Sequence, residues 1–487
     1  MKRVLLLLVD GLRPDLAESM LAAGELPELE AMTRNGGVAR AITAFPSTTS
    51  VAYLPFLTGC TPGRCNVPSI RWLDRSTYRG RWWRDRNAIR SYCGYQAVHL
   101  DRDIAPEAPS IFELVPDSVG IFTPVARGLT PARDPSRFER KFWGSVTHYT
   151  LHHQPSDNAA ARHLLSALEG PWRFIFAQFP AVDGYSHQTG PSAAPVRGAL
   201  RRFDQTMGRV RQRLEQRGEL DDTLILMVSD HGSASVHTHL DLPDWFRAHG
   251  VPTLSHPIVW EPAPRAAVMV AGNASAMVYA QPNSPRAHRW PLDRLRAPES
   301  FGTDRDLVEA LIKEDAVALV AGESGDGGVR VASKDGEADL TRVGSALRYA
   351  PRSGDPLSLG GARTATHRDW LHETWDGPFP DAPYQLLDQF RASRTGDLLA
   401  IANEGYDFRR RYEMPEHKSG HGSLIRAHMQ VPLWSSQPVP AAPLRTIDLL
   451  PAMLDWLGEP VPEGIDGCRA WSPAGERVEA LTASTEY

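Results

Sequence analysis

The chain has 487 residues, of which 42% are hydrophobic and 23% charged, values that are ordinary for a globular protein. Lys and Arg number 53 against 58 Asp and Glu, so the formal net charge of −5 excludes the strong positive field that draws proteins to nucleic acid. The length exceeds one compact core of ordinary size and suits a large α/β enzyme that carries an inserted cap.

The first expected element is a buried strand over Val4–Val9, in the sequence MKRVLLLLVDG. Lys2 and Arg3 precede this run, but Asp10 ends it before it reaches the roughly 7–15 apolar residues of a signal peptide. No other segment approaches the ~20 apolar residues of a membrane helix. We therefore expect a cytoplasmic protein with no membrane partner, in which the four cysteines are structural thiols.

Four short apolar runs have the character of parallel strands that are buried on both faces. They are Val4–Val9, Arg173–Gln178, Thr223–Val228 and Leu398–Ala402. Polar residues rich in Asp, His and Gly follow each run, and functional groups of doubly wound sheets gather beyond the carboxyl ends of the strands. We expect an α/β/α sandwich with a mostly parallel central sheet and an inserted α+β cap.

The composition changes along the chain and suggests where the cap is inserted. Residues 236–393 contain a Gly-rich stretch at 322–328 and a long polar region, so we assign them to the cap and residues 1–235 and 394–487 to the core. Near the end, Arg445–Gly458 has helical spacing, with Thr446 or Asp448 near its start and Gly458 as its stop.

Five places combine metal-binding side chains or hydroxyl groups with expected strand ends or loops. Taken singly each is weak evidence, because an Asp after a strand is more often a helix cap than a metal ligand. Together they supply three Asp, three His and a hydroxyl cluster, which suit zinc. Such a set can hold two metal ions about 3.5–4 Å apart for an in-line displacement. The candidates are Asp10, the hydroxyls of residues 47–50, Asp183 with His187, Asp230 with His231, and His421.

The order and spacing of these motifs resemble the alkaline phosphatase superfamily, and within it the type I phosphodiesterase/nucleotide pyrophosphatase family. The matching segments are LLLVDGLRPD, FPSTTS followed by LTG, DGYSHQTGP, VSDHG and GHG, and the resemblance covers about residues 1–240 and 395–475. It implies two Zn²⁺ ions, with Mn²⁺ or Fe as alternatives. By the resemblance, one ion is held by Asp183, His187 and His421, and the other by Asp10, Asp230, His231 and the nucleophile.

The same resemblance implies which hydroxyl reacts. In the family the nucleophile lies ten residues before the glycine of the LTG-like motif, and counting back from Gly59 gives Thr49. A metal can deprotonate a threonine hydroxyl, and a helix that begins at Thr49 would favour a phosphoryl anion. The alternative is that Thr49 only caps this helix while Thr48 or Ser47 reacts.

The function implied is zinc-dependent hydrolysis of a phosphodiester or pyrophosphate bond, through a phosphothreonine, in a small phosphate ester or nucleotide-like substrate. A phosphonate hydrolase or phosphomonoesterase of the same superfamily stays open. Where the family has an asparagine three positions after the nucleophile, this chain has Ala52, which leaves nucleotide specificity open.

Three further alternatives carry less weight. The segment from Cys60 to Arg64 resembles a sulfatase signature, but it follows Gly59 instead of preceding the LTG element. An inactive binding protein would lack a metal ligand, and none of the six is missing. His417 competes with His421 for the last ligand position, but the glycines on both sides of His421 favour the latter.

Overall fold

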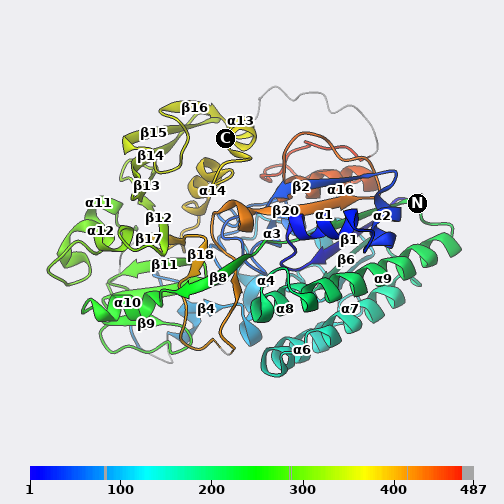
Figure 1. Ribbon diagram of the computed structural model, residues 1–487, viewed down its shortest axis with the longest axis horizontal. Coiled ribbons are helices and arrows are strands. Elements are labelled where there is room, and N and C mark those ends of the chain that lie inside the picture. Colours follow the sequence, from blue (N-terminus) through cyan, green and yellow to red (C-terminus); the bar gives the residue numbers. More distant parts are fainter. Residues whose placement is uncertain (82–84, 285, 287, 414, 474–487) are drawn as a thin grey trace.

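A computed structural model describes residues 1–81, 85–284, 286, 288–413 and 415–473 of the chain (Figure 1). It contains one sheet of seven strands and a second of nine. In Figure 1 the long helices lie beside the seven-stranded sheet on the right, and the nine-stranded sheet fills the left.

The seven-stranded sheet is the predicted core sheet. Strand β1 lies between β6 and β7 and runs parallel to both, and β5 extends the parallel part beyond β6. Strand β20 runs antiparallel to β7 and to β2. In order across the sheet the strands are β21 (Leu444–Arg445), β2 (Gly37–Ile42), β20 (Gln430–Ser435), β7 (Thr223–Val228), β1 (Arg3–Val9), β6 (Phe174–Phe179) and β5 (Ser118–Ile121).

Helices cover both faces of this sheet. Leu5 and Leu7 of β1 belong to one apolar cluster with α1, α2, α7, α8 and α9, whereas Leu6 and Leu8 belong to another with α3, α5 and α16. Burial on both faces explains why β1 is continuously apolar instead of alternating. The α/β/α class with a mostly parallel sheet is confirmed. The helices on the first face are α1 (Pro14–Ala22), α2 (Pro27–Thr33), α7 (Gln154–Ala167), α8 (Ala181–Thr189) and α9 (Ala194–Gln216); those on the second are α3 (Leu54–Thr58), α5 (Ile111–Leu114) and α16 (Leu449–Leu457).

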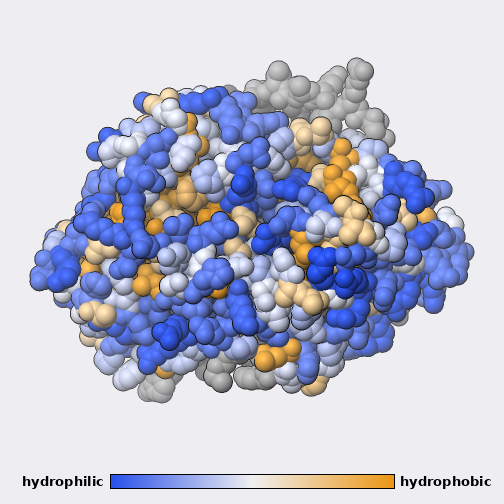
Figure 2. All heavy atoms as spheres, in the orientation of Figure 1, coloured by the Kyte–Doolittle hydropathy of each residue, from blue (hydrophilic) through white to orange (hydrophobic). Residues whose placement is uncertain are grey.

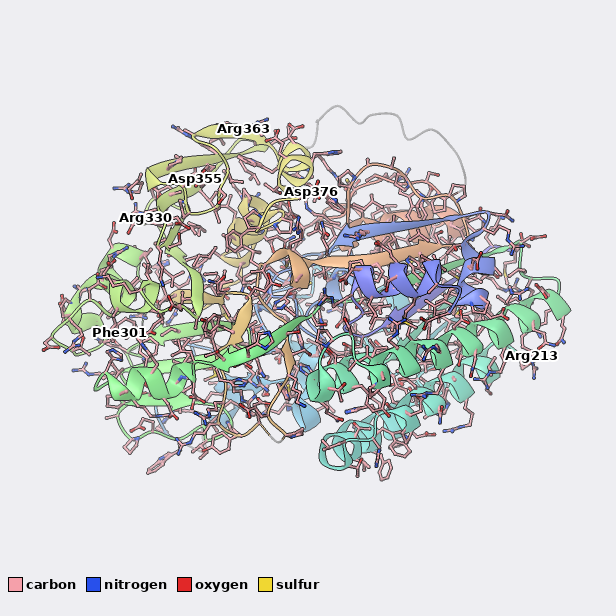
Figure 3. The ribbon with its side chains drawn as sticks, viewed as in Figure 1. Arg213, Phe301, Arg330, Asp355, Arg363 and Asp376 are labelled. Atoms are coloured by element: carbon pink, nitrogen blue, oxygen red, sulfur yellow. The ribbon has the colours of Figure 1, made fainter. Side chains whose placement is uncertain are left out.

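The nine-stranded sheet is antiparallel except where β9 pairs with β10. Its order is β16 (Arg363–Thr366), β15 (Ala346–Gly354), β14 (Gly336–Val343), β13 (Val329–Ser333), β12 (Val317–Glu323), β17 (Leu398–Ala402), β11 (Ser275–Ala280), β10 (Ala266–Ala271) and β9 (Thr253–Ser255). The helices of this part are α10 (Leu242–Ala248), α11 (Leu292–Arg296), α12 (Leu307–Ile312), α13 (His367–Thr374) and α14 (Ala382–Gln389). Side chains such as Arg330 of β13 and Arg363 of β16 are labelled in Figure 3.

The prediction that Leu398–Ala402 is a parallel strand of the core sheet is wrong. This segment is β17, in the middle of the second sheet and antiparallel to β11 and β12. Its residues belong alternately to two apolar clusters, so β17 is buried on both faces and has the same apolar sequence as a parallel core strand. The division of the chain into core and cap at 235/236 and 393/394 stays a prediction. Because β17 belongs to the second sheet, it favours a second boundary later in the chain. Residues 474–487 of the predicted core lie outside the described residues.

Smaller elements connect the two sheets. Strand β3 (Arg71–Leu73) pairs with β4 (Ile89–Ser91), and β8 (Ala234–His239) lies between β18 (Gly405–Asp407) and β19 (Ser419–Gly420). The remaining helices of the described residues are the short α4 (Leu100–Asp103) and α15 (Arg426–Met429) and the longer α6 (Arg137–Thr150), which packs on α7; 3₁₀ turns lie at residues 86–88, 94–99, 298–300 and 446–448.

Two predicted helix boundaries have different outcomes. The C-terminal helix is confirmed: the 3₁₀ turn at 446–448 leads into α16, which ends at Gly458 with φ +69°. The helix after the hydroxyl cluster begins at Leu54 and not at Thr49, because Ser50 has a left-handed φ of 73° that a helix does not accept.

The surface and the cysteines add two observations. None of the described helices is both long enough and apolar enough to cross a bilayer. On the face drawn in Figure 2, apolar side chains are scattered among hydrophilic ones. The four cysteines are free thiols, and Cys60 and Cys65 are buried.

Candidate active site

Asp10, Asp230 and His231 meet because β1 and β7 are parallel neighbours. Asp10 follows β1 directly, and Asp230 and His231 come just after β7, so the three side chains share one edge of the sheet. All three are buried. Gly11, with φ +68°, lets the chain turn there, and its amide donates to Asp230 Oδ1 at 3.3 Å.

Asp183 and His187 come from helix α8, which follows β6 on the other side of β1. We expected a strand end or loop, but the spacing of four residues places both on one helix face. Asp183 Oδ2 lies 3.2 Å from His187 Nε2. The close packing is visible at Gly11, where a Cβ would lie 2.6 Å from Asp183 Oδ1.

His421 reaches the same place from the far end of the chain, directly after β19. Its ring stacks on that of His231 with 3.6 Å between centroids, and lies 5.2 Å from that of His187. Gly272 permits this approach, because a Cβ there would lie 2.7 Å from His421 Nδ1. The prediction of His421 as part of the cluster rested on its flanking glycines, and the structure places it in the cluster.

Two sets of donor atoms are close enough to share a cation. Within each set all donor atoms lie within 4.8 Å of one another: Asp10, Asp230 and His231 form the first, and Asp183, His231 and His421 the second. The first set matches the one implied by the resemblance. In the second, His231 stands where the resemblance implied His187, which contacts Asp183 from the side.

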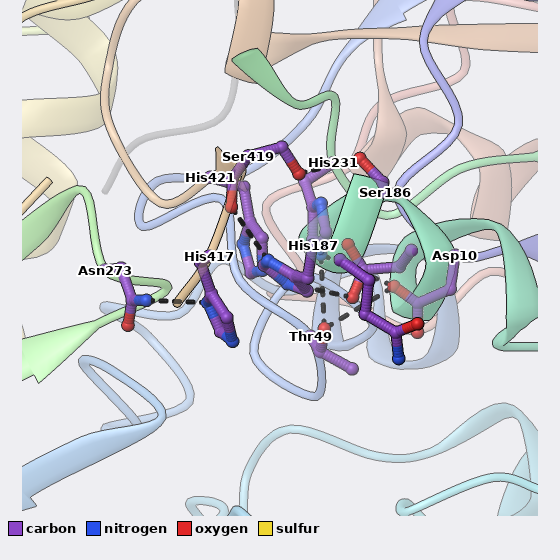
Figure 4. Close-up of polar contacts among 12 residues, drawn as sticks. Asp10, Thr49, Ser186, His187, His231, Asn273, His417, Ser419 and His421 are labelled. Carbon is purple, nitrogen blue, oxygen red and sulfur yellow. Dashed lines mark hydrogen bonds and ion pairs between the residues drawn. The ribbon is translucent and has the colours of Figure 1, made fainter. Parts of the chain in front are cut away.

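Thr49 lies at this cluster, as Figure 4 shows. Its Oγ1 is 3.1 Å from His231 Nε2 and donates to Asp10 Oδ1 at 3.5 Å. The competing hydroxyls are placed differently. Ser47 Oγ donates to the Ser423 carbonyl at 2.9 Å and accepts from the Gly422 amide, and the Thr48 side chain is fully buried. Thr49 is therefore the half-exposed hydroxyl beside the histidines.

The three imidazoles are oriented in the same way. Each Nδ1 lies at hydrogen-bond distance from a backbone carbonyl: 2.8 Å for His187 to Ser419, 3.0 Å for His421 to Ser47, and 3.0 Å for His231 to Gly232. A proton on Nδ1 leaves Nε2 with a free lone pair, which is the arrangement of metal-binding histidines. The donor set thus fits a metal ion with N and O ligands.

The three carboxylates are buried beside one another, and their negative charges repel. Asp183 Oδ1 and Asp230 Oδ2 are buried and accept no hydrogen bond from the described residues. Burial, reinforced by Asp183, raises the pKa of Asp230 to about 8, and burial with Asp230 raises that of Asp10. Burial also favours the neutral form of Asp183, but His187 outweighs it and the pKa of Asp183 is lowered. Bound cations would relieve this repulsion.

Several supporting residues were missed in the sequence. Tyr53 and Gln178 donate to Asp10 Oδ2 at 3.0 and 2.6 Å and fix its orientation. Gln178 is a polar residue inside the apolar strand FIFAQF, and that irregularity was the available signal. His417 stacks on His187 with 4.3 Å between centroids and contacts Glu413 at 2.9 Å, so it supports the cluster.

The sulfatase-like segment is part of the buried framework. Cys60 is fully buried, and the Thr61 hydroxyl contacts Asp388 at 2.6 Å and Asp466 at 2.8 Å. Ala52 is also buried and offers no side-chain donor at the position where the family has asparagine. These positions lie beside α3 and bring no hydroxyl or thiol to the histidines.

Comparison with known proteins shows which family and which solved structures this chain resembles. Residues 4–424 match the sequence model of the type I phosphodiesterase/nucleotide pyrophosphatase family. No curated protein sequence matches the chain significantly. The fold is similar to that of phosphonoacetate hydrolase from Sinorhizobium meliloti 1021 in complex with phosphonoformate, with 14% identity, coverage of 94% of this chain and 96% of that chain, and a TM-score of 0.54.

Two further solved structures have the same fold. Human ectonucleotide pyrophosphatase/phosphodiesterase 5 is 13% identical, with coverage of 96% and 97% and a TM-score of 0.55. An inactive variant of the murine protein in complex with AMP is 12% identical, with coverage of 95% and 96% and a TM-score of 0.53. At these identities the likeness shows the fold alone.

Proposed function

The chain belongs to the type I phosphodiesterase/nucleotide pyrophosphatase family, and we propose that it hydrolyses phosphodiester or pyrophosphate bonds of a small-molecule substrate with Thr49 as the nucleophile. Phosphoester hydrolysis is the activity class that the family supports. The observation that carries the proposal is the placement of the Thr49 hydroxyl beside His231 and Asp10, in a cluster of three aspartates and three histidines.

Two zinc ions fit the donor set best. One would be held by Asp183, His187 and His421, and the other by Asp10, Asp230 and His231 together with Thr49. His231 contacts both sets, and Mn²⁺ or Fe could use the same N and O donors. When bound, the two metals would supply positive charge for the attacking and the leaving oxygen of an in-line displacement.

The chain's own residues position the nucleophile. Thr49 Oγ1 lies beside His231 Nε2 and Asp10 Oδ1, the groups that would hold the second ion, and Tyr53 and Gln178 hold Asp10 in place. Thr49 Oγ1 forms the bond to phosphorus while the bond from phosphorus to the leaving oxygen breaks. A phosphothreonine results, and water then cleaves it, releasing phosphate or a phosphomonoester and restoring the hydroxyl.

A phosphonate hydrolase is the second candidate, because the phosphonoacetate hydrolase shares the fold over nearly the whole chain. It would use the same cluster and break a carbon–phosphorus bond instead of a phosphorus–oxygen bond. A phosphomonoesterase would likewise keep the site. A sulfatase is disfavoured because its signature cysteine would be Cys60, which is fully buried.

The test is hydrolysis of four chromogenic esters by zinc-loaded protein: bis-p-nitrophenyl phosphate, p-nitrophenyl thymidine monophosphate, p-nitrophenyl phosphate and p-nitrophenyl sulfate. Phosphonoacetate is assayed beside them by phosphate release. Thr49→Ala should lower kcat at least about 10³-fold. Thr48→Val is the matched control, because Thr48 Oγ1 is buried without a hydrogen-bond partner among the described residues and valine keeps the shape of the side chain; it should keep activity within about tenfold.

The outcomes separate the candidates. Diester cleavage that depends on Thr49 supports the proposal, whereas cleavage of the monoester alone moves the function to a phosphatase. Phosphate release from phosphonoacetate alone favours the second candidate. Full turnover by a folded Thr49→Ala protein would contradict the nucleophile.

A further inference from the structure

A second charged cavity lies outside the Thr49 cluster, between the β3 hairpin, strands β9 and β10, and the segment after β18. It has a volume of about 300 Å³. Figure 1 shows β4, β9 and α10 together in the lower left of the molecule. Four arginines line this space, and we call it the arginine cavity; they are Arg71, Arg247, Arg409 and Arg411.

Among the four lining arginines, Arg71 gives the strongest indication of a bound ligand. Its side chain is 7% exposed, and it donates to the Val270 carbonyl at 2.9 Å and to Cys93 Sγ at 3.3 Å. Its Nε is buried without a hydrogen-bond partner, and Glu413 is close enough for Arg71 to help lower the pKa of that carboxyl, but no ion pair joins the two side chains. A buried guanidinium with an unpaired N–H and no directly bound carboxylate is costly, so an anion that contacts it would be favoured.

The groups beside Arg71 add positive charge to the cavity. Arg409 Nε lies 2.9 Å from Glu413, and burial together with Arg71 lowers the pKa of Arg409. Burial, Arg71 and Arg409 also lower the pKa of His256, another lining residue, to about 3. Positive charges therefore face one another across the cavity.

The carboxylates near the cavity are largely committed to other groups. Asp241 accepts hydrogen bonds from the backbone amides of residues 244, 410 and 411. Asp244 contacts Arg247 at 2.6 Å and Arg411 at 3.3 Å. Glu261 is the other carboxylate of the lining. Asp244 and Glu413 thus pair with three of the four lining arginines, and among the described residues Arg71 is the lining arginine that no carboxylate contacts directly.

Contacts join the cavity to the Thr49 cluster. Arg409 forms an ion pair with Glu413 at 2.9 Å, and Glu413 contacts His417 at 2.9 Å, which in turn stacks on His187. Figure 4 shows His417 between Asn273 and His187. On the other wall, Arg71 binds the carbonyl of Val270, two residues before the Gly272 that packs on His421.

We propose that the arginine cavity binds an oxyanion, a phosphate or a carboxylate, separate from the group that reacts at Thr49. The planar guanidinium presents N–H donors that pair with two oxygens of a carboxylate or of a phosphate. Trp260 and Tyr412 line the cavity, are 55% and 48% exposed, and offer aromatic contacts to the rest of the ligand.

The anion can come from two sources. It is either the far anionic end of the substrate, in which case the inference rests on the proposed function, or a free anion that binds by itself.

The first experiment measures binding without turnover. Crystals are soaked in selenate, whose anomalous signal locates the ion, and the melting temperature is followed with added sulfate. We expect selenate beside Arg71 and a sulfate-dependent rise in melting temperature. Arg409→Gln and Arg71→Met should weaken sulfate binding about tenfold. Arg305→Gln, which changes an arginine whose side chain is 63% exposed, should bind as the unchanged protein does.

The second experiment identifies the source. KM is compared for bis-p-nitrophenyl phosphate and for a p-nitrophenyl diester with a terminal carboxylate or phosphate on its other arm. If the anion belongs to the substrate, Arg409→Gln raises KM about tenfold for the extended diester only. If KM does not change while sulfate binding is lost, the anion is free.

The proposal is overturned if selenate is absent from the cavity and Arg409→Gln keeps the sulfate-dependent rise in melting temperature. Because Arg71→Met removes a buried side chain, the more exposed Arg409→Gln decides the result if the Arg71 variant fails to fold. Should the unchanged protein cleave none of the esters, the proposed function fails while selenate and sulfate still decide the role of the cavity.

Discussion

Buried carboxylates have different partners beside the two sheets. Beyond the core strands, Asp10, Asp183 and Asp230 face one another, and Asp183 Oδ1 and Asp230 Oδ2 accept no hydrogen bond from the described residues. In the second sheet Asp397 is equally buried, yet Arg75 and Arg286 lie 3.0 and 2.6 Å from it.

This difference distinguishes carboxylates of a candidate binding site from carboxylates that form ion pairs within the fold. Asp397 also accepts from the backbone amides of Ala280 and Trp290, so its four contacts satisfy the charge within the chain. Arg330 with Asp339, and Arg445 with Asp381, follow the same pattern. A buried ion pair of this kind holds the fold together, whereas carboxylates that repel one another require a partner from outside.

The largest expected effect comes from Asp230→Asn. Losing one carboxylate of the proposed metal site should reduce the bound zinc per chain and lower kcat/KM at least about 10³-fold. Without metal the variant should be no less stable than the unchanged protein, because one repelling charge is gone. Metal content, kinetics and urea unfolding in a chelator measure these effects. An Asp230→Asn protein with full zinc content and full turnover would contradict the proposed difference between Asp230 and Asp397.

Asp397→Asn should have the reverse profile. Leaving Arg75 and Arg286 buried without their common partner should lower the free energy of unfolding by about 3–5 kcal/mol. Zinc content and kcat per folded molecule should stay the same, because Asp397 lies among the second sheet's arginines. Denaturant unfolding and metal analysis provide the measurement. A variant that loses zinc while keeping its stability would show that the two regions are not distinct.

Gly11→Ala tests how closely the core elements must approach. The residue has φ +68°, and an added Cβ would lie 2.6 Å from Asp183 Oδ1. Gly24→Ala is the matched control, since Gly24 has φ +69° with open space around it. Both variants should lose about 1–2 kcal/mol of stability to backbone strain. Only Gly11→Ala should also lose activity, about tenfold or more, and equal activities would mean that Asp183 can move aside.

The fold class could be predicted from the sequence, and the candidate site residues could be named, because both rest on local signals. Strands β1, β6 and β7 are short apolar runs, and their parallel pairing brings the residues that follow them to one edge. Asp10, Asp183, Asp230 and His231 were therefore found from their position after strands. Their roles as metal ligands, and that of Thr49 as nucleophile, stay predictions.

The second sheet shows where such reasoning fails. Strand β17 has the composition of a parallel core strand, but its partners β11 and β12 are remote in sequence. Pairing direction follows from long-range contacts that periodicity does not record. Arg71 carries no local sequence signal that distinguishes it from a solvated surface arginine, and only the fold shows that its side chain is buried with an unpaired Nε.

Asp157 represents a third way to bury a carboxylate and gives the smallest expected effect. It is 5% exposed on α7 and accepts the amide of Ala181. Burial raises its pKa to about 8, Asp10 adds to the shift, and Arg202 opposes it, so the proton itself removes the charge.

Because the pKa is raised on folding, the unfolded chain releases this proton from about pH 4 upward while the folded protein keeps it to about pH 8. Stability from this residue is therefore complete at low pH and falls as pH rises through that window. Asp157→Asn lacks the titration, so its stability relative to the unchanged protein should rise by about 4 kcal/mol between pH 5 and 9. Urea unfolding of both proteins across this range measures the difference, in which all other titrating groups cancel. Parallel curves would mean that Asp157 is charged in the folded protein and that a cation, as at Asp397 or at the metal site, balances it.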